Sequence, residues 1–292
     1  MVGMSRGNRG AGTRWLVAAC AAAVAVATVV ALPDRAVAAN ATPDSGVGQP
    51  APFIGSGNAP RSGHGTSNSL DWAGFAATPT GSLVTSVTGS WTEPSVVCPV
   101  NKVQQSAFWV GIDGFAATDP TVQQVGTDAD CLKGSKKVAG GPVYYAWYQM
   151  YPSSLVVLNP ASYPVAPGDV LTGGVSVVLG GYLLTLSDSR GGLLWSFSQV
   201  VAATTATLNA SAEWIAEAPT ACKAGTCKAL PLADFSSVAF TGATVNSVPV
   251  NGPGFVDSQI TMTKDKKGKK VKASPSALGG TGGDFTVTWL TN

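Results

Sequence analysis

The chain has 292 residues, of which 45% are hydrophobic and only 12% are charged. Its 18 basic and 16 acidic residues nearly balance, so nothing suggests an electrostatic footprint for nucleic acid. The only histidine, His64, lies in a segment poor in core-forming residues. Because Ser-His-Asp and Cys-His systems need a rigidly held base, and catalytic zinc usually takes histidine ligands, these chemistries are disfavoured. We expect no metal and no cofactor.

Residues 1–38 are predicted to be a secretory signal peptide. Three arginines precede an apolar run from Trp15 to Leu32, and Ala36-Val37-Ala38 offers a small-residue cleavage site. The run is long enough to leave membrane anchoring as an alternative. Cleavage would remove four arginines and Asp34, leaving 14 basic against 15 acidic residues. We expect a secreted, nearly neutral monomer without stable membrane association.

The rest of the chain divides into two parts. Residues 39–68 are rich in Gly, Pro, Ser and Asn, which predicts a flexible linker or a short pro-segment. In residues 69–292, short runs of β-branched and aromatic residues alternate with turn-forming clusters, which predicts one all-β domain without long helices. The runs that we assign to strands are 83–92, 107–112, 143–151, 170–178, 182–186, 193–200, 235–240 and 285–290.

Four cysteines remain after signal cleavage, and an even number in an exported chain favours two disulfides. Three pairings are possible. We favour Cys222–Cys227, which closes a short loop, together with Cys98–Cys131. A zinc site is the alternative, but no histidine lies near these cysteines and their spacing is not typical of zinc ligands.

Glutamate is scarce after the signal, with only Glu93, Glu213 and Glu217. Glu213 and Glu217 lie four residues apart, so on a strand their side chains point to the same face. Their neighbours Trp214 and Ile215 create an apolar context that raises a carboxyl pKa toward acid–base use. The competing interpretation is a solvated outer face.

Two further runs combine aromatic and polar side chains. On a strand, Trp147, Gln149 and Tyr151 share one face, as do Trp109 and Asp113. Such side chains on adjacent strands would line a groove for an extended polymer. Core packing is the alternative, but it would bury the polar groups of Asp113 and Gln149.

Seven short motifs, in this order, resemble the eqolisins, the glutamic peptidases. They are Asp71–Gly74, Val87–Pro94, Trp109–Gly114, Gln124–Gly126, Ala146–Pro152, Ala212–Glu217 and Leu232–Phe235, and the run Phe285–Trp289 also fits. The resemblance implies a concanavalin-A-like β-sandwich of two bent antiparallel sheets, with a substrate groove on the concave face. It also implies cleavage of polypeptides at acid pH without metal or cofactor.

The resemblance further implies a catalytic pair. The family's catalytic glutamine precedes a Thr-Gly step, which corresponds to Gln124 before Val125-Gly126. The second glutamate of the Ala212–Glu217 motif corresponds to the catalytic glutamate, hence Glu217. Gln123 is adjacent to Gln124 and would point to the opposite face of the strand, so a register error of one residue would exchange the two. The implied groove residues are Trp72, Trp109, Asp113, Trp147, Gln149 and Tyr151.

Three positions depart from the family pattern. Asp71 stands where asparagine is common, Tyr145 where an acidic residue is frequent, and Gln149 where glutamate is frequent. The last two remove negative charge from the groove, which would alter the pH profile or the subsite preference.

Two other functions remain open on the same fold. A glycoside hydrolase would use Glu213 and Glu217, but their backbones lie roughly 13 Å apart on an extended strand, too far to favour a retaining pair. A lectin-type binding module would need only the aromatic groove. Separately, six lysines between Lys264 and Lys272 predict the exposed tip of a hairpin, with docking to an anionic cell surface as a further hypothesis.

Overall fold

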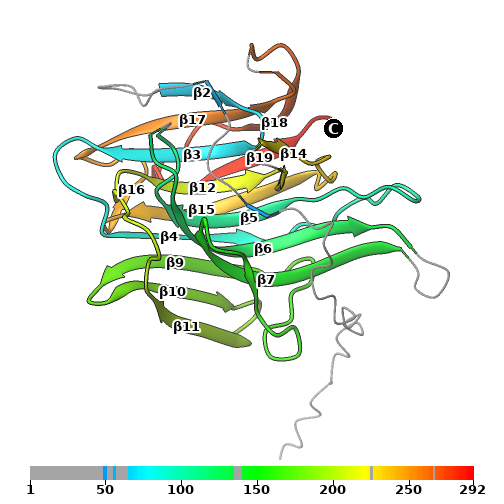
Figure 1. Ribbon diagram of the computed structural model, residues 1–292, viewed down its shortest axis with the longest axis horizontal. Helices are drawn as coiled ribbons and strands as arrows, with labels where there is room; N and C mark the ends of the chain where they lie inside the picture. The colour runs from blue at the N-terminus through cyan, green and yellow to red at the C-terminus, as the bar shows by residue number, and fades with distance from the viewer. Residues whose placement is uncertain are drawn as a thin grey trace, which may run out of the picture. The chain divides into compact units, whose positions relative to one another are not determined.

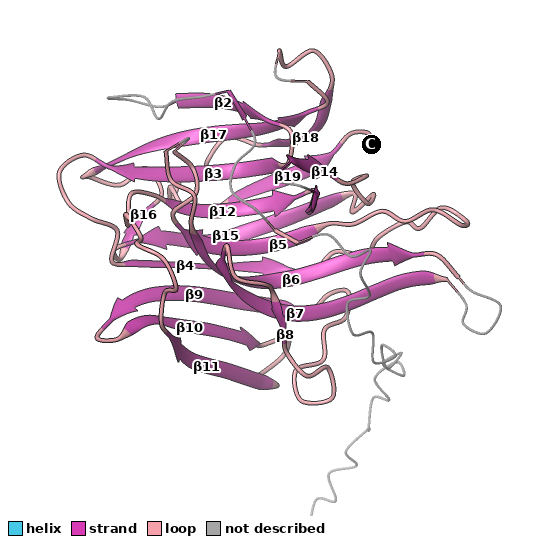
Figure 2. Cartoon of the chain, viewed as in Figure 1, coloured by secondary structure: helices cyan, strands magenta, loops and turns pink. Residues whose placement is uncertain are grey.

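The computed structural model describes residues 49–50, 55–56, 65–116, 118–134, 140–223, 226–265 and 267–292. The predicted signal peptide and most of the predicted linker lie outside the described residues. In the described part of the chain, no helix is long and apolar enough to cross a membrane. The described residues form strands and loops (Figures 1 and 2).

A first run of paired strands carries most of the motifs from the sequence. Its order is β2 (Gly65–Ser69), β17 (Phe255–Thr263), β3 (Trp72–Pro79), β12 (Ala212–Glu217), β5 (Ala107–Ile112), β6 (Val122–Leu132) and β7 (Gly141–Tyr151) (Figure 1). All these neighbours are antiparallel except β2 and β17, which are parallel. The short strands β1 (Gly55–Ser56) and β8 (Val156–Val157) pair with β2 and β7.

A second run of strands forms the other layer. Its order is β18 (Val271–Pro275), β19 (Phe285–Trp289), β15 (Ser237–Val245), β4 (Ser86–Thr92), β9 (Val170–Val178), β10 (Gly181–Asp188) and β11 (Trp195–Val201). The hairpin of β17 and β18 joins the two layers into one continuous hydrogen-bonded network. A short strand β16 (Val248–Pro249) pairs with β15, and a separate hairpin consists of β13 (Thr220–Lys223) and β14 (Thr226–Ala229).

The main hydrophobic core lies between the two layers. Phe75 of the first layer packs edge-on against Phe285 of the second, with ring centroids 4.8 Å apart. The indole N–H of Trp214 donates to the backbone oxygen of Thr88 across the same interface at 2.8 Å. The all-β sandwich expected from the alternating strand pattern is therefore confirmed, because each layer buries one face against the other.

The opposite face of the first layer is also closed by large side chains. We call it the site face, and it carries Trp72, Trp109, Trp147 and Ile215 as a second buried cluster. Because side chains alternate along a strand, residues 107, 109 and 111 of β5 belong to the site face, whereas Phe108 and Val110 belong to the main core. Strands β5 and β12 are accordingly buried along their whole length.

Both predicted disulfides are present. Cys98 is bonded to Cys131, and Cys222 is bonded to Cys227 across the β13–β14 hairpin. The strands predicted at 107–112 and 170–178 are found with those bounds, as β5 and β9. Strand β2 begins at Gly65, inside the segment predicted as a linker, because it finds a parallel partner in β17.

The lysine-rich segment 264–272 was predicted to be exposed, and this is only partly correct. It does connect the hairpin strands β17 and β18, and Gly268 takes the positive φ of 72° that the turn requires. Lys264, Lys267 and Lys269 are exposed, but Lys272 is only 6% exposed. The reason is that Lys272 already belongs to β18, where its side chain points into the protein rather than away from the turn.

Candidate active site

Glu217 ends strand β12 on the site face and is fully buried. Its position is fixed from both sides, because it pairs in register with Trp72 of β3 and with Ala107 of β5. Its carboxylate oxygen Oε2 accepts the indole N–H of Trp109 at 2.8 Å. A charge-assisted hydrogen bond of this length stabilises negative charge on that oxygen and holds the carboxylate in one orientation.

Gln124 lies on β6, on the same face, and is also fully buried. Its side-chain nitrogen donates to Oε1 of Gln149 on the neighbouring strand β7 at 2.9 Å, and Gln149 in turn donates to the backbone oxygen of Ser153. In the described part of the chain, Oε1 of Gln124 has no hydrogen-bond partner. The amide is thus oriented through one N–H, while its second N–H and its carbonyl oxygen are available for other interactions.

The two glutamines of β6 face opposite ways. With its amide nitrogen toward the carboxylate, Gln123 donates to Asp113 Oδ2 at 3.1 Å. Gln124 instead contacts Gln149 on the site face. In register, Gln124 is opposite Gly111 of β5, and Gly111 is in turn opposite Glu213 of β12. Glu217 is opposite Ala107, so Trp109 stands between Gln124 and Glu217 on the intervening strand.

The predicted aromatic residues are brought together on this face. Trp72 and Trp109 form an edge-to-face pair with centroids 4.9 Å apart, and Trp147 belongs to the same cluster, with Tyr151 packed against it. Trp72 therefore supports the indole that donates to Glu217. Such a rigid aromatic wall favours precise placement of the carboxylate.

A buried carboxyl pair, not predicted from the sequence, lies on β6 next to Trp147. The hydroxyl of Tyr145 lies 2.9 Å from Asp128 Oδ2 and 3.1 Å from Asp130 Oδ2, and the Trp147 indole donates to Asp128 at 2.6 Å. Burial, reinforced by the neighbouring Asp130, raises the pKa of Asp128 well above its usual range, and burial raises the pKa of Asp130 to about 7. The even spacing from Gln124 to Asp128 and Asp130, four and six residues along β6, was the sequence signal that these carboxyls share its face.

Asp113 does not take part in the Gln124–Gln149 and Trp109–Glu217 contacts. It has a positive φ of 75° at the end of β5, and its carboxylate accepts the backbone N–H groups of Leu208 and Ala210. Burial, with a contribution from Asp119, raises its pKa to about 7 in spite of those donors. These contacts tie the loop before β12 to the sheet.

Glu213 lies near Asp113 and Asp119. It is fully buried, and neither carboxyl oxygen has a hydrogen-bond partner in the described residues. Burial raises its pKa well above the usual range, and the nearby hydroxyl of Ser211 offsets only part of the rise. Burial therefore favours the neutral form of Glu213.

The predicted pro-segment contributes one residue to the site. Gln49 forms a two-way backbone bridge with Thr220, three residues beyond Glu217. Its side-chain oxygen accepts N–H groups of Gln149 at 3.4 Å and of Leu155 at 3.5 Å. Composition alone gave no signal for this contact, because a single residue in a Gly/Pro-rich segment carries no periodicity.

Among the described residues, no group of three or more His, Cys, Asp or Glu side chains is arranged to hold a metal ion. The chemistry available on the site face is that of one oriented carboxylate, one oriented amide and the buried carboxyls beside them. Fold and site together define an all-β sandwich protein with a carboxyl–amide site.

Comparison with known proteins identifies the family of the chain. The model of the peptidase A4 family matches residues 70–289, which is most of the chain. The chain therefore belongs to the peptidase A4 family, the eqolisins, and is a glutamic endopeptidase. The resemblance seen in the motifs is confirmed. A search of curated protein sequences finds no match.

Solved structures agree with the fold. Scytalido-glutamic peptidase with a transition-state analogue inhibitor gives a TM-score of 0.59 at 21% identity, and its complex with a peptide-based analogue gives 0.59 at 23%. SCP-B, an eqolisin in complex with the tripeptide Ala-Ile-His, gives 0.53 at 20%. Each comparison covers 76% of this chain and 98% of the other.

Proposed function

We propose that this glutamic endopeptidase is secreted, acts in acid, and hydrolyses polypeptides with Gln124 and Glu217 as its catalytic pair. The observation that carries the proposal is that both groups lie on the site face, each oriented by its own hydrogen bond, although the strand register puts Glu213 rather than Glu217 directly across Gly111 from Gln124. The Glu217 carboxylate accepts the N–H of Trp109, and the Gln124 amide is held by Gln149. Glu213, the rival carboxyl on β12, lacks a comparable donor.

In the first half of the proposed reaction, Glu217 acts as a general base. Its carboxylate takes a proton from a water molecule, and the oxygen of that water attacks the scissile carbonyl carbon. The second N–H of the Gln124 amide donates to the oxyanion that forms, and its Oε1 helps to hold the attacking water. The Gln149 contact makes this assistance preorganised, because the amide does not need to rotate during the reaction.

In the second half, protonated Glu217 acts as a general acid. It delivers its proton to the leaving amine nitrogen while the C–N bond breaks, which regenerates the carboxylate. The Trp109 indole donates to Oε2 and stabilises this carboxylate. No other group is needed to balance the proton transfers.

A polypeptide is the expected substrate class, since the family cleaves peptide bonds. The structural relatives were solved with a transition-state analogue inhibitor, a peptide-based analogue and a tripeptide, which supports binding of an extended peptide on the corresponding face. Trp109, Trp147 and Tyr151 would provide its aromatic contacts. Because Gln124 and Glu217 are fully buried, we expect the segment around Gln49 to move or be removed before substrate binds.

Acid operation is supported by the buried carboxyls. Burial raises the pKa of Glu93 to about 8 and those of Asp113 and Asp130 to about 7. A folded-state pKa raised above the unfolded value gives stability that is complete in acid and is lost as the pH rises through the folded pKa. The two disulfides support export, since such bonds persist in oxidising compartments.

The decisive experiment assays the mature protein against unfolded protein substrates and against polysaccharides between pH 2 and pH 8. Proteolysis that is strongest in acid and lost in Glu217→Gln supports the proposal. Cleavage of polysaccharide, binding without turnover, or full proteolysis by Glu217→Gln would overturn it.

A further inference from the structure

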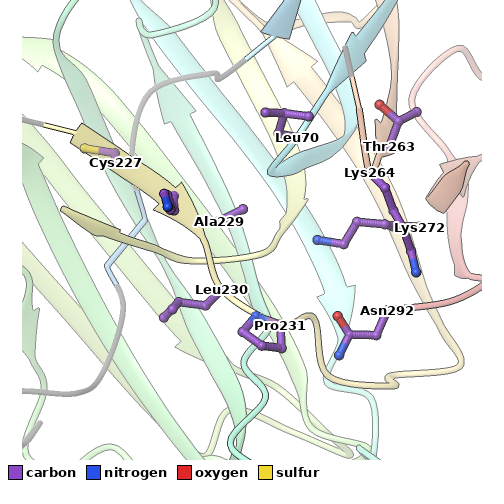
Figure 3. A pocket seen from close by; sticks show the side chains of 10 residues that line it. Leu70, Cys227, Ala229, Leu230, Pro231, Thr263, Lys264, Lys272 and Asn292 are labelled. Atoms are coloured by element: carbon purple, nitrogen blue, oxygen red, sulfur yellow. The ribbon is translucent and has the colours of Figure 1, made fainter. Parts of the chain in front are cut away.

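A cavity of about 440 Å³ lies away from the residues assigned to catalysis (Figure 3). Lysines are prominent in its lining: Lys228 follows Cys227 in the β13–β14 hairpin, and Lys264 and Lys272 come from the β17–β18 hairpin. Figure 3 shows a lysine side chain of the second hairpin extending across the cavity toward Leu230 and Pro231. No acidic side chain is among the residues that line it.

Lys272 is the unusual member of this group. The residue is only 6% exposed, yet its ammonium group makes no hydrogen bond or ion pair with any described residue. The charge of Asp71 attracts it, and the charge of Lys264 repels it. Burial lowers its pKa to about 8, so the group is still a cation in acid and neutral solution.

The ammonium nitrogen is not among the described side-chain atoms that are buried without a partner, so it faces the cavity, where a bound ligand can replace the hydration that the rest of the side chain excludes. An ammonium group offers three N–H donors and no acceptor, so the partner must be an acceptor and is best an anion. Lys228 and Lys264 add positive potential to the same cavity, which favours an oxyanion over a neutral ligand. We propose that this cavity binds an oxyanion, such as a carboxylate, phosphate or sulfate group, with Lys272 as its central ligand.

Two backbone hydrogen bonds link segments that line the cavity to the residues that follow Glu217. The backbone oxygen of Asp71, next to the lining residue Leu70, accepts the N–H of Ala218, the residue after Glu217. On the other side, the N–H of Leu230 donates to the backbone oxygen of Pro219. An extended peptide that passes Glu217 in this direction would reach the cavity. In that case the bound anion would be an acidic group of the substrate, and this statement rests on the proposed function. The alternative source is a free inorganic anion.

The test measures anion binding directly and needs no activity. Calorimetric titration of inorganic sulfate and phosphate at pH 5 and low ionic strength is expected to show one site on the unmodified protein. Lys272→Met should weaken that binding by about ten- to a hundredfold, as expected for loss of a charged hydrogen bond, and Lys264→Met by less. Lys272→Arg, which keeps the charge, should retain part of the affinity. Lys102→Met, at an exposed lysine outside the cavity, is the matched control and should bind like the unmodified protein.

Absence of sulfate and phosphate binding, or equal binding by folded Lys272→Met, overturns the proposal. The source of the anion is then decided with peptides in which one phosphoserine is moved stepwise away from the scissile bond. A KM that falls at one position, only while Lys272 is present and inorganic phosphate is absent, assigns the site to the substrate. Binding of inorganic anion without such an effect assigns it to a free anion. If proteolysis fails while anion binding persists, the proposed function is wrong and the anion site stands.

Discussion

Glu213 and Glu217 occupy the same strand and the same face, and both are fully buried, yet their surroundings differ. At one end of β12, Glu217 accepts the indole N–H of Trp109. Toward the other end, Glu213 makes no comparable hydrogen bond and is in register with Gln124 across Gly111. Burial, reinforced by Asp113 and Asp119, disfavours its ionisation. Burial is therefore common to the two carboxyls, and the donor is what distinguishes them. The proposed function makes this directed donor the reason why Glu217, rather than Glu213, acts as the base.

The comparison is tested most strongly by removing each carboxyl in turn. Glu217→Gln is expected to lower kcat by about 10,000-fold, because general base and general acid are both lost. Glu213→Gln should change kcat by no more than about threefold when measured in acid, where Glu213 is already neutral. Steady-state kinetics on a peptide substrate, with circular dichroism as the control for folding, measures both. The reverse ranking would reassign the catalytic glutamate.

The amide partner gives the next largest effect. Gln124→Ala is expected to lower kcat by about 100- to 1000-fold with little change in KM, since the lost N–H acts mainly on the oxyanion. Gln123→Ala is its matched control, because Gln123 is equally buried on the same strand but contacts Asp113. The control should lose stability rather than activity per folded molecule. Equal losses of kcat in both variants would contradict the assigned register.

A variant of Trp109 tests the hydrogen bond that the indole donates to Glu217. Trp109→Phe keeps an aromatic ring against Trp72 but removes the N–H that reaches Glu217. We expect kcat to fall by about 10- to 100-fold, the usual range for a hydrogen bond to a charged group, together with a changed pH profile on the acidic limb. Trp147→Phe loses the hydrogen bond to Asp128 instead, so the acidic limb of its pH–rate profile should be unchanged. An unchanged profile in Trp109→Phe would mean that the indole does not tune Glu217.

The acidic group at the Glu213 end predicts how stability depends on pH. Glu213 and Asp113 have pKa values raised by burial, so their contribution to stability is complete in acid and disappears as the pH rises through the folded pKa, about 7 for Asp113. Glu213→Gln removes one of these ionisations. Its melting temperature should exceed that of the unmodified protein by roughly 5 °C at pH 7, and should differ little at pH 4. Differential scanning calorimetry at the two pH values measures these melting temperatures. A higher melting temperature of Glu213→Gln at pH 4 alone would contradict the expected direction of the pKa shift.

Gln49 gives the smallest expected effect. Gln49→Ala removes the side-chain contacts with Gln149 and Leu155 but keeps the backbone bridge to Thr220. In the chain that retains residues 39–68, the initial rate should rise by about two- to fivefold, because substrate displaces a more weakly held segment. Chain from which the segment has been removed should show no difference between Gln49 variants. A lower rate in Gln49→Ala would show that Gln49 supports the amide network instead of covering it.

The fold class, the family and the face on which each candidate lies could all be predicted from the sequence. These are local properties: alternation along a strand puts Gln124 and Gln123 on opposite faces and puts Glu213 and Glu217 on the same one, whatever the neighbouring strands are. Cysteine spacing likewise led to the pairing that is found, because Cys222 and Cys227 close a short hairpin.

Which side chains contact one another depends on the three-dimensional arrangement of the strands. The donor to Glu217 is 108 positions away in the chain, and Gln149, which holds Gln124, is 25 positions away. Strand order and register bring these partners together, and neither can be read from one strand's pattern. The same holds for Lys272, which looked like one of six solvated lysines and is instead buried beside a cavity. The sequence determined what each side chain is able to do, and the non-local pairing of strands decided its solvation and its partners, which set its chemistry.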